Sequence, residues 1–93
     1  MKCFQIKVFG FVQGVFFRHS AKIEAEKSGL TGYVKNLDDD SVEIVVCLSL
    51  GDGDENEIKE FIKWCAHGPA LARVEKVETK ETAPQKFPDF RII

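Results

Sequence analysis

The chain has 93 residues, of which 44% are hydrophobic, and its formal net charge at pH 7 is −2. This length predicts one domain, residues 1–93, with enough apolar material for a single core without disulfide support. The small negative charge excludes long-range attraction to nucleic acid or to an anionic membrane, and no apolar run approaches the length of a membrane span.

Apolar residues are spaced in two ways along the chain, one typical of strands and one typical of helices. Apolar residues recur at every second position in strand-like segments, as at Phe4, Ile6 and Val8, and at helical spacing in longer segments, as at Ile58 and Phe61. In chain order, the predicted elements are a strand over 3–9, a helix over 17–28, strands over 30–36 and 41–48, a loop over 51–54, a helix centred on 58–65, a strand over 72–79 and a short edge strand over 90–93.

Turn signals separate these elements. Gly29 and the pair Gly68-Pro69 end the two helices. The acidic run Asp38–Asp40 predicts a hairpin turn between the second and third strands. Val74 and Val77 are three residues apart instead of two, which predicts a bulge in the fourth strand.

The order βαββαβ predicts an α+β fold of the ferredoxin-like, split βαβ type, an antiparallel sheet with two helices on one face. A crossover helix makes the first two strands parallel, so their carboxyl ends meet at one edge of the sheet. With the third strand between them, these ends are about 10 Å apart. If Val34 points into the core, Asn36 lies on the same face and points towards Arg18 at the start of the first helix.

The three cysteines, Cys3, Cys47 and Cys65, are odd in number, widely separated and without a CxxC pair. This pattern predicts buried free thiols in a reducing compartment, and therefore a cytoplasmic protein. No group of His, Cys and carboxylate residues has the spacing of metal ligands, so we expect neither a metal nor a cofactor.

The stretch Gly10-Phe-Val-Gln-Gly-Val-Phe-Phe-Arg18 connects the first strand to the first helix. Its glycines allow a turn in which successive N–H groups converge, and the helix start adds free N–H groups and the positive end of its dipole. The guanidinium of Arg18 suits phosphate oxygens, so the stretch predicts a phosphate cradle. It lacks the Gly-Lys-Ser/Thr ending of a nucleotide P-loop. The residues of the predicted cradle are Phe11, Val12, Gln13, Gly14, Val15 and Phe16.

This stretch and Gly32-Tyr-Val-Lys-Asn36 resemble the two signature segments of the acylphosphatase family, in the expected order and separation. Residues 68–74 and 89–92 resemble later segments of that family. The resemblance implies the ferredoxin-like fold and metal-free hydrolysis of the carboxyl–phosphate bond in small acyl phosphates, such as acetyl phosphate. It also implies that Arg18 binds the phosphate and that Asn36 orients the attacking water.

The sequence departs from the family pattern in two places. The family usually has glycine where Asp40 stands, and another glycine near Leu48, where this chain continues into a longer loop up to Asp54. Aspartate tolerates a left-handed backbone less well than glycine does. We expect both changes to affect stability and turn geometry more than chemistry, unless the charges of Asp38–Asp40 lie near the anion.

Other side chains near the two motifs are candidates for a catalytic or a structural role. His19 follows Arg18 directly, but one residue along a helix is a rotation of about 100°, so we do not expect it to act as general base. His67, just before the helix end, is expected to be structural. Phe11, Phe16 and Phe17 are expected to be core residues or cradle walls.

Three alternatives stay open at the level of sequence. The chain could be a phospho-ligand binding module without turnover, an RNA- or protein-binding domain of the same shape, or one domain of a larger maturation protein that uses carbamoyl phosphate. The net charge and the lack of an RNP-type aromatic motif argue against RNA. The preferred hypothesis is a monomer that binds an acyl phosphate and releases inorganic phosphate, with no nucleic acid and no membrane.

Overall fold

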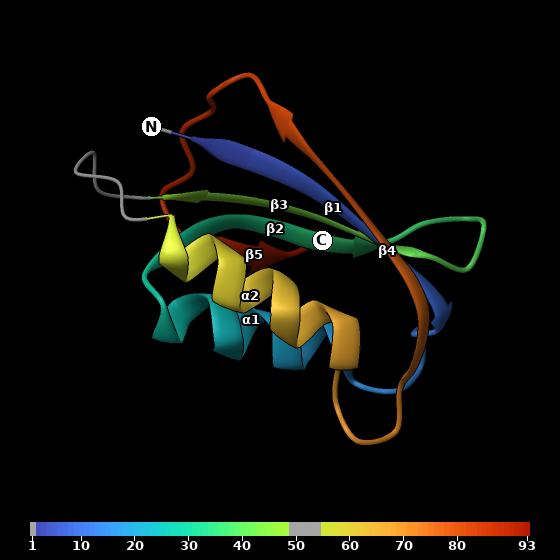
Figure 1. The fold of residues 1–93 in the computed structure, drawn as a ribbon. Helices are drawn as coiled ribbons and strands as arrows, with labels where there is room; N and C mark the ends of the chain where they lie inside the picture. The colour runs from blue at the N-terminus through green and yellow to red at the C-terminus, as the bar shows by residue number, and fades with distance from the viewer. Residues whose placement is uncertain (1, 49–54) are drawn as a thin grey trace.

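Two helices cover one face of a five-stranded sheet (Figure 1). The computed structural model describes residues 2–48 and 55–93, so the predicted loop over 51–54 and the extra residues after Leu48 lie outside the described residues. No helix in this described part has the length and apolar character of a membrane span. The elements are β1 (Cys3–Phe11), α1 (Phe17–Lys27), β2 (Leu30–Asn36), β3 (Val42–Leu48), α2 (Asn56–His67), β4 (Arg73–Thr82) and β5 (Phe90–Ile92).

The strand order is β4-β1-β3-β2-β5, with β3 antiparallel to both of its neighbours. This confirms the prediction that β1 and β2 run parallel with β3 between them. The predicted antiparallel pairing is confirmed for β4, β1, β3 and β2, whereas β5 runs parallel to its neighbour β2, with Phe90 opposite Gly32 and Ile92 opposite Val34. Residues 83–89 join β4 to β5 by crossing from one edge of the sheet to the other (Figure 1).

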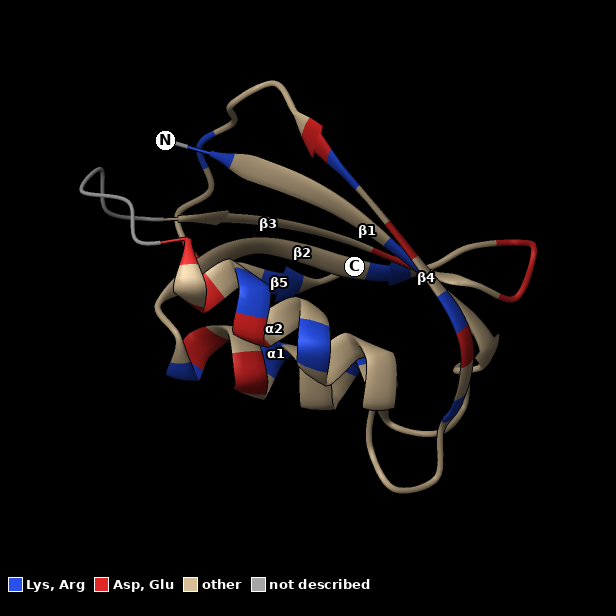
Figure 2. Ribbon diagram, in the orientation of Figure 1, with Lys and Arg blue, Asp and Glu red and all other residues tan. Residues whose placement is uncertain are grey.

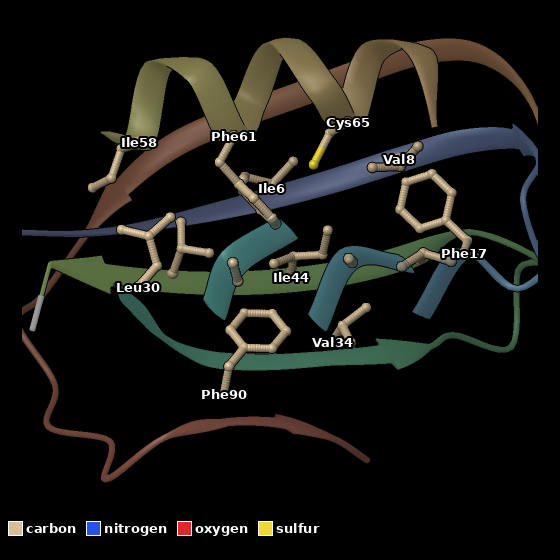
Figure 3. Close-up of a cluster of buried hydrophobic side chains, with 14 of the residues drawn as sticks. Ile6, Val8, Phe17, Leu30, Val34, Ile44, Ile58, Phe61, Cys65 and Phe90 are labelled. Carbon is tan, nitrogen blue, oxygen red and sulfur yellow. The ribbon is translucent and has the colours of Figure 1, made fainter. Parts of the chain in front are cut away.

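The main core lies between the sheet and the helices. Figure 3 shows Phe61 and Cys65 of α2 reaching towards Ile6 and Val8 of β1, all of them buried. The predicted faces of α1 and β3 are also buried here, through Ala21 and Ala25 and through Val42, Ile44, Val46 and Leu48. Burial of each large apolar side chain contributes about 1.5–3 kcal/mol to stability. The face of each strand that carries the apolar side chains, at every second position, is therefore the face that meets the helices.

The predicted bulge is confirmed between Val74 and Val77. Phe9 of β1 pairs with Lys76, whereas the next residue, Gly10, pairs with Val74, so Glu75 is the extra residue. A Cβ at Gly10 would lie 2.1 Å from the carbonyl oxygen of Arg73, and the φ angle of Gly10 is 131°. The close approach of β4 therefore requires glycine at the start of the cradle.

Two of the three cysteines differ from expectation. Cys3 and Cys47 form a disulfide across β1 and β3, on the sheet face opposite the helices. They are 44 residues apart in sequence but directly opposite in register, which is why sequence spacing alone missed the pair. Cys65 is free and buried, as predicted, and burial raises the pKa of its thiol, so the unreactive thiol form is favoured.

Reduction of the disulfide is expected to lower the free energy of unfolding by about 2 kcal/mol or more, because the cross-link restricts the unfolded chain. Urea unfolding with and without reductant measures the effect. A Cys3→Ala, Cys47→Ala double mutant should have a urea midpoint near that of the reduced wild-type protein. Reductant should not change the midpoint of this mutant. If reductant leaves the urea midpoint of the wild-type protein unchanged, and three thiols can be titrated in urea without reductant, Cys3 and Cys47 are free cysteines.

The turn between β2 and β3 is shaped by its acidic residues. Asp39 accepts hydrogen bonds from the N–H and the hydroxyl of Ser41, and Lys7 Nζ lies 2.9 Å from Asp39 Oδ2. The Ser41 hydroxyl bond, more than Lys7, lowers the pKa of Asp39 to about 2. Asp40 has a left-handed backbone with φ at 71°, a conformation that glycine adopts with less strain than aspartate does.

Asp40→Gly is expected to raise the free energy of unfolding by about 0.5–1 kcal/mol. Relief of the left-handed strain is worth roughly 1–2 kcal/mol, and the greater freedom of glycine in the unfolded chain offsets part of it. Asp38→Gly is the matched control, since it removes the same charge from a residue whose φ is not positive. Urea midpoints compare the two, and an equal gain in both would assign the effect to charge instead of backbone.

Candidate active site

The connection between β1 and α1 turns sharply before the helix begins. Gly14 and Phe16 both have left-handed backbones, with φ angles of 75° and 66°. The side chains of Val12 and Val15 are almost completely buried and anchor the connection to the core. The turn therefore buries both valines and leaves Gly14 and Phe16 exposed.

The N–H groups of this turn are free to bind a ligand. Among the described residues, Gly14, Val15 and Phe16 donate no backbone hydrogen bond, and no side chain caps α1 at Phe16. The first N–H groups of any α-helix also lack a partner within the helix. Unpaired donors at the positive end of a helix dipole favour an anion.

Gln13 fastens the turn to the neighbouring hairpin. Its Nε2 donates to the carbonyl oxygens of Leu37 at 2.8 Å and Ser41 at 2.9 Å, on either side of the acidic turn. Since Leu37 directly follows Asn36, these bonds hold the end of β2 against the cradle. The sequence predicted Gln13 only as a cradle residue, and its partners became visible only in the tertiary structure.

Arg18 lies in the first turn of α1 and is half-buried. Within residues 2–48 and 55–93, no carboxylate lies within ion-pair distance of its guanidinium. The preceding Phe17 is buried against Trp64 of α2, with ring centroids 5.3 Å apart, which fixes the start of the helix. The backbone of Arg18 is therefore held in place, and its guanidinium has no acidic partner within the described residues.

Asn36 is the last residue of β2. It pairs with Val42 of β3, which in turn pairs with Val8 of β1, so the three residues form a row across the sheet near the cradle. Val34 is fully buried on the helix side, which places Asn36 on that side too, as predicted. The Oδ1 atom of Asn36 is buried and, among the described residues, has no hydrogen-bond partner. An unpaired buried oxygen is costly unless a ligand or water binds it.

One cavity of about 270 Å³ brings these residues together. It is lined by Val12, Gly14, Phe16, Phe17, Arg18, His19, Asn36 and Ile92. His19 is also among the lining residues, although one step along the helix turns it about 100° from Arg18, and the expectation that it is not the general base stays a prediction. Phe11 is 60% exposed and lines neither the core nor this cavity, so it is not the wall that we expected. No sequence signal indicated Ile92.

The acidic turn stays outside the cavity. Figure 2 shows Asp38–Asp40 projecting beyond the ends of β2 and β3, and none of the three lines the cavity. Asp39 is paired with Lys7. The concern that these charges weaken anion binding directly finds no support in this arrangement.

Two further hollows in the described part of the chain contain none of the predicted site residues. One, of about 320 Å³, is lined by residues of and next to the two helices: Glu24, Ser28, Glu60, Phe61, Lys63, Trp64 and His67. A larger hollow of about 550 Å³ lies over β1 and β4, is lined by Gln5, Lys7, Glu78, Thr79 and Lys80, and contains none of the predicted site residues. No three His, Cys, Asp or Glu side chains within 2–48 and 55–93 are grouped as metal ligands would be. The cavity at Arg18 and Asn36 is therefore the candidate site.

The sequence pattern of the acylphosphatase family matches residues 4–92. The chain belongs to the acylphosphatase family. It is 42% identical over 92 residues to an acylphosphatase of Thermotoga petrophila, covering 99% of this chain and 97% of that protein.

Solved structures agree with this membership. An acylphosphatase from Coxiella burnetii is 39% identical, with a TM-score of 0.89 over 99% of this chain and 92% of that one. An acylphosphatase from Bacillus subtilis is 34% identical, with a TM-score of 0.90 over 100% and 99% of the two chains. The fold is ferredoxin-like, and the activity is that of an acylphosphatase, the hydrolysis of acyl phosphates to a carboxylate and inorganic phosphate.

Proposed function

We propose that the cavity is the catalytic site, in which the cradle and Arg18 bind the phosphoryl group and Asn36 orients the attacking water. One observation carries this assignment: Arg18 and Asn36 line the same cavity, and within the described residues Arg18 has no acidic partner and the buried Oδ1 of Asn36 has no hydrogen-bond partner. One group suits an anion and the other suits a water molecule, which are the two partners that hydrolysis must bring together.

The reaction needs positioning and charge stabilisation more than a strong acid or base, because a carboxylate is a good leaving group. Oxygen of the water held by Asn36 bonds to phosphorus, and the bond from phosphorus to the acyl oxygen breaks with its electron pair leaving on the carboxylate. The proton of the water passes to an oxygen of the substrate's own phosphate. Arg18 and the N–H groups of Gly14, Val15 and Phe16 stabilise the negative charge on the transferring group.

We also propose that residues 1–93 work as one domain, as a cytoplasmic monomer that needs no metal, nucleic acid or membrane. The shared core of both helices and all the strands that flank the site supports a single unit. A disulfide is uncommon in a reducing cytoplasm, so this location requires a fold that survives reduction of Cys3–Cys47. The expected loss of about 2 kcal/mol leaves a typical domain folded.

Turnover at saturating substrate is expected to be nearly flat between pH 5 and 8, since guanidinium, amide and backbone N–H groups do not titrate there. A histidine acting as general base would instead impose an acid limb near pH 6.5. The His19→Gln, His67→Gln double mutant should stay active, and a chelator should have no effect on hydrolysis of acetyl phosphate. If an acid limb is seen and disappears in the double mutant, a histidine and not the substrate phosphate accepts the proton of the water.

A further inference from the structure

We propose that Phe16 and Ile92 form an acyl subsite, which selects apolar, uncharged acyl groups over acyl groups that carry a carboxylate. The inference rests on the proposed function, because it takes the phosphate to lie at Arg18. It adds a preference that the family activity does not specify.

Phe16 shows an unusual combination of backbone and side chain. Its φ of 66° is left-handed, which is strained for a bulky residue, yet its ring is 71% exposed and gains little from burial. Neither secondary structure nor the core requires phenylalanine here. A residue held in strain with its ring open to the cavity is typical of a binding site.

Ile92 reaches the same cavity from the edge of the sheet. It alternates with Arg91 along β5 and shares the helix-side face of Phe90, which is buried. The N–H of Ile93 donates to the carbonyl oxygen of Val34 at 2.9 Å, so the end of β5 is fixed beside β2. The side chain of Ile92 remains 39% exposed at the cavity.

The remaining walls decide what can bind there. Val12 and Phe17 also line the cavity but are almost fully buried, so Phe16 and Ile92 offer most of its accessible apolar surface. Arg18 is the only Lys or Arg among the lining residues, and the phosphoryl group engages it. A carboxylate on the acyl group would lose water against Phe16 and Ile92, whose side chains offer it no hydrogen bond, which is unfavourable.

The volume allows an acyl group beside the phosphate. At roughly 30 Å³ per water molecule, the cavity of about 270 Å³ has the volume of about nine waters. A phosphate fills only part of that space. The apolar remainder fits the start of an aliphatic or aromatic acyl group.

The experiment compares kcat/KM for benzoyl phosphate and succinyl phosphate, of which only the second carries an acyl carboxylate. The wild-type protein is expected to prefer benzoyl phosphate. Ile92→Lys should shift the ratio towards succinyl phosphate by about 10-fold or more, the scale of discrimination by single contacts in apolar pockets. A ratio is used because a new cation strengthens phosphate binding for both substrates.

Ile93→Lys is the matched control, because it adds the same charge one residue later, just past the end of β5, at an exposed position outside the cavity lining. It should leave the ratio at the wild-type value. Phe16→Gly removes the ring while favouring the left-handed backbone, so it should fold and should lower the preference for benzoyl phosphate. If Ile92→Lys does not fold, Ile92→Thr takes its place with the same expected direction of shift.

The subsite is supported if both positions shift the ratio beyond Ile93→Lys. It is overturned if either position leaves the ratio unchanged, or if the wild-type protein prefers succinyl phosphate. Inhibition by inorganic phosphate separates this result from failure of the proposed function. An unchanged ratio together with intact phosphate inhibition that depends on Arg18 rejects only the acyl subsite, whereas phosphate inhibition independent of Arg18 rejects the phosphate site itself.

Discussion

Arg18→Ala is expected to weaken inhibition by inorganic phosphate and to lower kcat/KM for acetyl phosphate, each by the equivalent of about 2–4 kcal/mol. The guanidinium contacts phosphate oxygens in the bound substrate and in the transition state, so both quantities fall. No acidic partner within the described residues is left unpaired by the change, so the fold should keep its stability.

Arg91→Ala is the control for this substitution. Arg91 is an exposed arginine on β5 that pairs with Asp89 at 2.7 Å, and it does not line the cavity. Its loss should leave phosphate inhibition and turnover close to wild type. If Arg18→Ala shows the same phosphate inhibition as Arg91→Ala, the phosphate cradle is assigned to the wrong residues, whatever the rate.

Asn36→Ala is expected to reduce turnover about 100-fold or more, because it removes the group that positions water. Inhibition by inorganic phosphate should change little, since the anion is held by the cradle and Arg18. Stability supplies a second measurement: Oδ1 is buried with no partner among the described residues, so its removal leaves no broken hydrogen bond there. The variant should therefore unfold at the wild-type urea concentration or slightly above it.

A purely structural role for Asn36 predicts the opposite pattern. A turn-forming asparagine would hydrogen-bond its neighbouring backbone, and its replacement would lower the unfolding midpoint. If Asn36→Ala loses stability and phosphate affinity together, the water-positioning role is wrong. Turnover, phosphate inhibition and urea unfolding of the same preparation decide between the two.

The sequence by itself determined the elements and the faces that they bury. Alternation at Phe4, Ile6 and Val8 depends only on local pattern and burial, and the structure has the strand there. The same parity argument put Asn36 on the face of Val34, and the crossover helix made β1 and β2 parallel, so the meeting of Asn36 with the start of α1 was predictable. The resemblance implied a glycine position at Asp40, and its backbone is left-handed, a conformation that glycine adopts with less strain.

Only the tertiary structure decided which distant residues complete the site and the sheet. The disulfide of Cys3 with Cys47 depends on strand register, and the direction of β5 depends on how residues 83–89 cross the sheet, neither of which has a local sequence signal. For the same reason, Gln13 bonding the hairpin and Ile92 lining the cavity were invisible in the sequence. Local periodicity fixes which face of an element is buried, whereas contacts between elements are fixed by how the whole chain packs.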